Sequence, residues 1–269
     1  MIRIEKVSVT GIPEAIRGMR NPMNSWDKSD SGICKGGDTG IGCGNCAISD
    51  TCAHEYDNEY TIGKNDYALM EKLAKAGTSH SKYRRMMVVY LDITAPLYWW
   101  KEFDTYKVGT VANSCSTMHK IHSKEFTLGD FSCEHLLAPE YIREDDEIAN
   151  DCGLYAHEIT IDETARKNII DNHEDVNFFM WPEDFLKATV KMLNECRAAY
   201  LLTKDKRYWW QMIQLLPSSY NQKRTVMLNY EVLANIYHDR KNHKLDEWLE
   251  FCEWIRDELP YSKLITMEE

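Results

Sequence analysis

The sequence lacks any apolar run long enough to cross a membrane, and its first residues lack the apolar core of a signal peptide. The opening stretch MIRIEKVSVTG instead alternates apolar and polar side chains, as a half-buried strand does. We therefore expect a cytoplasmic protein that has no membrane partner.

The sequence also lacks a surplus of basic residues. It has 32 Lys and Arg against 43 Asp and Glu, which gives a formal net charge of -11. A nucleic-acid surface needs clustered cations for the phosphate backbone, so we expect no nucleic-acid partner. A small anionic ligand needs only a few local cations and stays possible. No internal repeat and no linker interrupt the 269 residues, so a single domain over 1–269 is expected.

A disulfide framework is not expected, because nine cysteines are an odd number and are scattered through a chain of intracellular type. Four of them form a cluster in a Cys-rich insertion at about 32–54, namely Cys34, Cys43, Cys46 and Cys52. Two residues separate Cys43 from Cys46, which lets both thiolates bind one zinc ion. An Fe–S cluster would use the same ligands, and Cys-rich loops also arise by chance. A structural metal, zinc first, is the hypothesis.

The remaining cysteines fall into two groups. Cys115 lies inside a polar segment and has no histidine placed to activate it. We expect the others to be buried apolar side chains, namely Cys133, Cys152, Cys196 and Cys252.

The pattern of apolar residues predicts strands and helices in alternation, with a mostly helical C-terminal half. Strands are expected over residues 2–10 and 83–94. Asn65 and Asp66 are expected to cap a helix that reaches Lys75, and a second helix is expected over 95–106. Residues 126–150 form an irregular acidic region. Further helices are expected near 160–172, 182–202, 204–215, 225–241 and 245–258.

Two segments have the composition of a binding site. In the helix expected over 225–241, Asn229, Leu233, Ile236 and Arg240 share one face. Arg240 either binds an anion there or reaches solvent at the helix end, where cations suit the helix dipole. The Gly-, Thr-, Ser- and Asn-rich loop 108–118 either holds a phosphate or is a tight turn.

The stretch AGTSHSKYRRMMVVYLDITAPLYWWKEFDTYKVGTVANSCSTMH, together with Leu216, Pro217, Asn229 and Arg240 at their spacing, resembles the flavin-dependent thymidylate synthases. The resemblance covers roughly residues 65–120 and 208–255. It implies an α/β (α+β) fold with a helix-flanked central sheet, assembled as a homotetramer. The surface around Trp99 and Trp100 is expected to be apolar enough to need covering in that assembly.

The resemblance also implies roles for individual residues. The implied flavin contacts are His80, Thr105, Tyr106, Lys107 and Asn229, and the implied nucleotide contacts are Glu102, Asn113, Ser114, Ser116 and Arg240.

Several family positions are changed. Thr105, Tyr106 and Lys107 replace an Arg-His-Arg triplet, and Met118 and Glu231 each replace an arginine. The arginine before Leu216 and Pro217 is missing as well. A different ligand, or a different way of binding the same one, is therefore open.

The implied activity is FAD-dependent one-carbon or methyl transfer to a pyrimidine deoxynucleotide, of the dUMP to dTMP type. NADPH and a methylene-folate would be co-substrates, and a hydroxymethylated pyrimidine is a variant product. The flavin carries the difficult chemistry in such a reaction. The alternative is a non-catalytic homologue that sequesters or senses a nucleotide. A third view is a structural protein whose aromatic residues merely pack.

Overall fold

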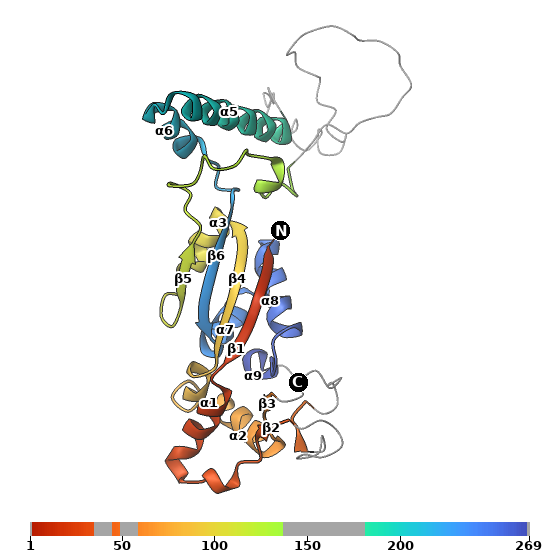
Figure 1. The fold of residues 1–269 in the computed structure, drawn as a ribbon. Coiled ribbons are helices and arrows are strands. Elements are labelled where there is room, and N and C mark those ends of the chain that lie inside the picture. The colour runs from red at the N-terminus through yellow and green to blue at the C-terminus, as the bar shows by residue number, and fades with distance from the viewer. Residues whose placement is uncertain (1, 35–44, 49–58, 137–180, 268–269) are drawn as a thin grey trace, which may run out of the picture. The chain divides into compact units, whose positions relative to one another are not determined.

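A computed structural model describes residues 2–34, 45–48, 59–136 and 181–267 (Figure 1). The chain divides into two compact units. The first is formed by Met1–Cys115 and Asn221–Glu269, and the second by Ser116–Tyr220. Two units can belong to one domain or to two, so the single domain stays a prediction. The helix expected near 160–172 lies outside the described residues.

The first unit contains a four-stranded antiparallel sheet of order β1-β4-β6-β5 (Figure 1). Its strands are β1 Arg3–Thr10, β4 Val88–Pro96, β5 Val111–Ser114 and β6 Asn221–Asn229. The central pair β4 and β6 runs in register from Val88 opposite Asn229 to Pro96 opposite Asn221. Every second residue of β4 is buried, as expected for a strand with one covered face.

Helices cover that buried face. The helices of this unit are α1 Ile12–Arg20, α2 Lys64–Lys75, α3 Leu97–Phe103, α7 Tyr230–Arg240, α8 Asp246–Asp257 and α9 Lys263–Thr266. Short 3₁₀ turns span Asn21–Met23, Trp26–Lys28 and Lys82–Arg85. No described element covers the other face of the sheet around Tyr90 and Val111, which are 45% and 60% exposed.

An aromatic cluster on α3 and α8 forms the centre of the core. Trp99 stacks on Phe103 with ring centroids 5.0 Å apart. Trp99 also packs on Trp248 at 4.7 Å. Trp99 and Trp100 are both 0% exposed in the single chain. The expectation that they form an apolar surface was therefore wrong, because Trp248 on α8 packs on Trp99, and Arg224 of β6 lies over Trp100.

The helix expected from Asn65 begins one residue earlier, and its cap is different. The backbone N–H groups of Asn65 and Asp66 donate to the two carboxylate oxygens of Asp30, at 2.9 and 3.0 Å. Asp30 thus caps α2 from a distant segment. Such a cap brings together residues far apart in the sequence, which local spacing cannot reveal.

The expected helix over 225–241 was wrong in its first part. Residues up to Asn229 belong to strand β6, and the helix starts at Tyr230. Pairing with β4 on one side and β5 on the other decides this, because tertiary context overrides helical propensity. The same pairing turns residues 111–114 of the expected loop into strand β5.

The boundaries of the strand expected over 83–94 and of the helix expected over 95–106 also shift. Residues 82–85 form a 3₁₀ turn, so the strand begins at Val88, and the helix after it ends at Phe103. Two very short strands, β2 Gly32–Ile33 and β3 Tyr60–Thr61, pair separately from the main sheet.

The described part of the second unit consists mainly of turns and two helices. It contains the 3₁₀ turn Leu128–Asp130 and the helices α5 Pro182–Thr203 and α6 Lys206–Leu215, close to the expected helices. Its own small core includes Phe126, Phe131, Leu193 and Met212. Within the ranges that the structure describes, no helix has the length and apolar character needed to span a membrane.

Candidate functional site

Arg240, the last residue of α7, has a defined set of partners. Its Nη1 lies 2.9 Å from a carboxylate oxygen of Glu102, and its Nε donates to the Tyr106 hydroxyl at 3.0 Å. The guanidinium also lies over the Trp248 ring, 4.9 Å from the centroid. Its side chain is 20% exposed, so it is neither buried without a partner nor a solvated helix end. The structure thus brings together three predicted site residues from two segments distant in the sequence.

Glu102 on α3 is the shared acceptor of this cluster. Besides Arg240, its carboxylate accepts a hydrogen bond from the Trp248 indole at 3.0 Å. The Nε2 atom of His243 lies 3.5 Å away. The Nδ1 atom of His243 accepts the backbone N–H of Leu245, which assigns the ring proton of a neutral His243 to Nε2. Donor groups of Arg240, Trp248 and His243 therefore converge on one carboxylate oxygen of Glu102. The contact with this oxygen orients the Arg240 guanidinium.

Tyr106 lies between Arg240 and Asp239. Burial raises the pKa of the Tyr106 hydroxyl, and the hydrogen bond from Arg240 lowers it by less, so the net shift is upward. The phenol donates weakly to Asp239 at 3.4 Å. Tyr106 therefore stays protonated at neutral pH and acts as a neutral hydrogen-bonding group rather than a base.

We call Glu102, Tyr106, Arg240, His243 and Trp248 the Arg240 cluster. Sequence reasoning missed two of its members, His243 and Trp248. Their only signal was the aromatic and apolar spacing of residues 243–254, which is equally typical of any amphipathic helix.

A second charged cluster lies at the start of α7. Glu231 is 7% exposed and lies 3.9 Å from both Arg84 and Arg85. Ser81 is also within 3.5 Å of its carboxylate. The Nε of Arg84 is buried and makes no hydrogen bond within the described part of the chain. The acidic residue at position 231 thus compensates two cations that precede β4.

The other predicted flavin contacts are scattered over the first unit. His80 is exposed in the turn that Gly77 begins. Thr105 lies in the turn after α3, where its hydroxyl donates to the Glu102 carbonyl at 2.7 Å. Lys107 is exposed.

Asn229 has a structural role at the junction of β6 and α7. Its side-chain oxygen accepts the Val232 N–H at 3.1 Å and caps the helix. Gly109, with φ of 84°, packs against it, and a Cβ there would lie 2.9 Å from the Asn229 amide nitrogen. Only glycine therefore fits this close approach without strain. Contact of Asn229 with flavin stays a prediction.

The predicted nucleotide contacts Asn113 and Ser114 are exposed on the edge strand β5, opposite Thr225 and Arg224. Ser116 belongs to the second unit, where its hydroxyl accepts the backbone N–H groups of Met118 and His119. A pairing of Ser116 with Arg240 on one ligand stays a prediction.

Of the four predicted metal ligands, Cys34 and Cys46 lie in the described residues and are free thiols. Cys43 and Cys52 lie outside them. Cys196 and Cys252 are buried, as expected, Cys133 is half-buried, and Cys115 is exposed. Cys152 lies outside the described residues. Within those residues, no three His, Cys, Asp or Glu side chains gather closely enough to hold a metal ion.

No family model matches the sequence, and no curated protein matches it either. Solved structures, in contrast, are similar to this chain. The flavin-dependent thymidylate synthase ThyX from Helicobacter pylori, complexed with FAD and dUMP, is similar at a TM-score of 0.56 and 14% identity, over 98% of each chain. A second structure of thymidylate synthase X from the same organism, with FAD and dUMP, gives 0.55 and 14%, over 99% of this chain and 98% of that one. This likeness establishes the fold, a mixed α/β fold with an antiparallel sheet, as expected.

Proposed function

We propose that the chain is a divergent flavin-dependent thymidylate synthase-type protein that binds a pyrimidine nucleoside monophosphate at the Arg240 cluster. The observation that carries the proposal is the convergence of Glu102, Tyr106 and Arg240, each assigned to a ligand site beforehand, on a fold shared with proteins that bind FAD and dUMP. Among the described residues Nη2 of Arg240 has no hydrogen-bond or ion-pair partner, so this nitrogen would donate to the phosphate, because charge-assisted hydrogen bonds suit phosphate oxygens.

FAD is the proposed cofactor, and the residues fit it in part. His80 and Lys107 are exposed and offer polar atoms to a flavin, and Tyr106 offers a neutral phenol. Asn229 already uses its side-chain oxygen as a cap. Bound flavin would supply hydride chemistry, and NADPH and a methylene-folate would be the co-substrates of a methyl transfer. A homotetramer belongs to the same proposal, with the open sheet face around Tyr90 and Val111 as the surface to cover.

The first experiment is the visible absorbance spectrum of the purified chain, followed by identification of any small molecule released on denaturation. A yellow protein that releases FAD supports the proposal. Calorimetric titration with dUMP then tests the nucleotide site. A colourless protein that gains no flavin absorbance with added FAD and gives no heat with dUMP would contradict it.

Arg240→Ala tests the phosphate contact. Charge-assisted hydrogen bonds contribute roughly 1.5–3 kcal/mol each, so dUMP binding should weaken by about one to two orders of magnitude. The matched control is Arg256→Ala on α8, which removes an exposed arginine paired with Asp257. Equal dUMP affinity in wild type and Arg240→Ala would remove Arg240 from the site.

Asn229 can be tested for a flavin role separately from its cap. Asn229→Asp keeps a side-chain oxygen for the Val232 N–H but loses the amide donor, whereas Asn229→Ala loses both. Loss of flavin in both variants supports a contact with the amide. Loss in the alanine variant alone means that the cap positions the chain and that Asn229 does not contact flavin.

A second function, nucleotide binding without catalysis, is favoured by specific charges. Glu102 already neutralises Arg240, and Glu231 faces Arg84 and Arg85. Fold likeness does not decide between an enzyme and a binding protein. Conversion of dUMP to dTMP with FAD, NADPH and methylene-folate distinguishes them: product formation supports the enzyme, and tight dUMP binding without product supports the binding protein.

A further inference from the structure

The Cys-rich part of the first unit is built on a very small ladder of strands. β2 and β3 pair through two residues each, Gly32 with Thr61 and Ile33 with Tyr60. On the other edge of the same segment, Cys46 forms a single bridge to Gly63, and the Ala47 N–H donates to the Ile62 carbonyl at 2.9 Å. Residues 59–63 thus lie between two short neighbours. Ladders of this size are marginal by themselves in water.

Little apolar burial compensates for that. Ile62 is 0% exposed, and its N–H donates to the Tyr261 hydroxyl at 2.9 Å. The remaining apolar residues of the flanking strands, Ala47 and Ile48, are partly buried, and Ile33 is 50% exposed. Small segments with so little core generally need an additional cross-link, such as a disulfide or a metal ion.

The pairing places two cysteines on one face of the ladder. The Cys34 N–H donates to the Glu59 carbonyl at 2.7 Å, so Cys34 lies opposite Glu59, while Cys46 lies opposite Gly63. Paired residues point to the same face of a sheet, and residues 59, 61 and 63 alternate onto one face. Cys34 and Cys46 therefore flank Thr61 on that face.

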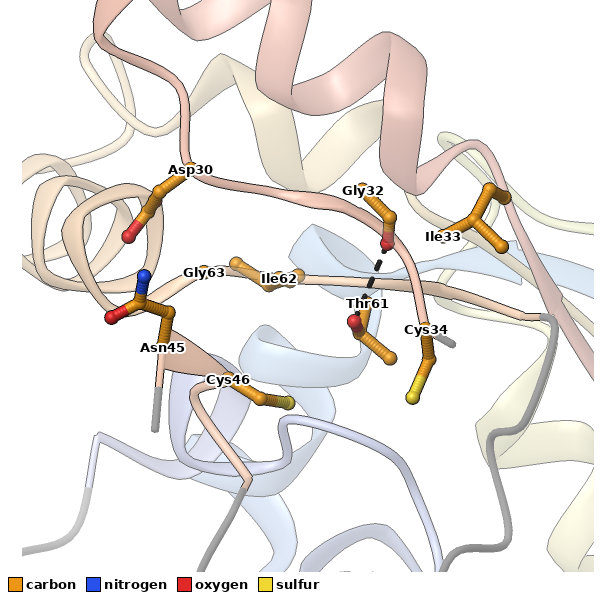
Figure 2. A pocket seen from close by; sticks show the side chains of 9 residues that line it. All are labelled: Asp30, Gly32, Ile33, Cys34, Asn45, Cys46, Thr61, Ile62 and Gly63. Carbon is orange, nitrogen blue, oxygen red and sulfur yellow. Dashed lines mark hydrogen bonds between the residues drawn. The ribbon is translucent and has the colours of Figure 1, made fainter. Parts of the chain in front are cut away.

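Both cysteines line one pocket with Asp30, Thr61 and Gly63 (Figure 2). Figure 2 shows the two sulfur atoms on either side of Thr61, and the Thr61 hydroxyl donates to the Gly32 carbonyl at 3.3 Å. Asp30 is the carboxylate among the lining residues, and both of its oxygens accept N–H groups at the start of α2. The described lining thus offers a metal the two sulfur atoms, together with the Asn45 side chain and the Thr61 hydroxyl.

We propose that Cys34 and Cys46 are two thiolate ligands of a structural zinc ion that joins the two edges of this ladder. Thiolates select zinc over Mg²⁺ and Ca²⁺, which prefer oxygen ligands. Each thiol releases its proton as it binds the ion, so no oxidant or reductant is needed. Cys43 and Cys52, the other two ligands that the sequence spacing predicts, lie outside the described residues. The site is independent of the proposed nucleotide function.

The test uses the full chain, purified without chelator. Elemental analysis should find about one zinc per chain. Cys34→Ser and Cys46→Ser, and by the sequence prediction Cys43→Ser and Cys52→Ser, should each reduce zinc content severalfold. Cys115→Ser, which changes an exposed cysteine next to β5, is the control and should keep the metal.

A second measurement covers variants that fail to fold. Wild-type protein is stripped and loaded with Co²⁺, and its spectrum should show thiolate-to-cobalt charge-transfer bands, which Cys115→Ser retains. Three results would overturn the proposal: metal-free wild type without these bands, full zinc content in folded Cys34→Ser and Cys46→Ser, or a disulfide between the two cysteines. Iron with inorganic sulfide would overturn the choice of zinc.

Discussion

Removal of one negative charge from the Arg240 cluster should strengthen the binding of phosphate-bearing ligands. In Glu102→Gln, the side-chain oxygen still accepts the Trp248 indole N–H, now 3.0 Å from the carboxylate, so the shape of the cluster is kept. What changes is the charge beside Arg240, whose Nη1 lies 2.9 Å from the carboxylate. A phosphate on Arg240 would no longer meet this neighbouring negative charge.

The size of the effect follows from the exposure of the pair. Two unit charges 4 Å apart interact by about 1 kcal/mol in water and about 4 kcal/mol at an effective dielectric constant of 20. The Arg240 and Glu102 side chains are 20% and 35% exposed, so solvent screening favours the lower end. We expect about 1–1.5 kcal/mol, or about tenfold tighter binding of dUMP. Folding should lose less than about 1 kcal/mol.

The assay is calorimetric titration of wild type and Glu102→Gln with dUMP and with deoxyuridine, which lacks the phosphate. The dUMP affinity should rise and the deoxyuridine affinity should stay the same. Glu253→Gln on α8 is the control, since it removes an exposed carboxylate without a change at Arg240. The gain should shrink as salt is added. An equal loss of affinity for both ligands would refute the reasoning and make Glu102 a direct contact to the base or sugar.

The remaining predictions concern stability and assembly. Asp66 is 0% exposed; burial raises its pKa, but hydrogen bonds from Ser29, Ser31 and Arg20 outweigh this and lower it. Its stabilising effect should therefore be complete above the unfolded pKa of about 3.9 and be lost as the pH falls below it. Asp66→Asn should cost about 3–5 kcal/mol in urea unfolding at pH 7, because Arg20 stays buried without its charge partner, and should flatten the acid limb; an unchanged acid limb contradicts this. Asn229→Ala should cost about 0.5–2 kcal/mol through the lost cap, and an equal loss in Asn229→Asp would argue against the cap. Sedimentation at micromolar concentration should give a tetramer, and a monomer would count against the assembly.

The aromatic and apolar spacing of the sequence determined much of the local structure. Strand β1 and helices α5, α6 and α8 were predictable, because each depends on periodicity within one segment. The α/β fold with a helix-flanked sheet was predictable from resemblance. The resemblance also assigned Glu102 and Arg240 to a nucleotide and Tyr106 to a flavin, and the structure places the three side chains in contact.

Contacts between distant segments decided the rest. Residues 221–229 form a strand because β4 and β5 offer hydrogen-bonding partners on both sides, which no local pattern records. Asp30 caps α2 across more than thirty residues, and contacts with α8 and β6 bury the two tryptophans that were expected to form an apolar surface. The contacts of Arg240 with Glu102 and Trp248 have the same origin. A charged side chain with more than half of its surface buried needs polar or aromatic partners, and only the tertiary structure determines which groups lie within reach.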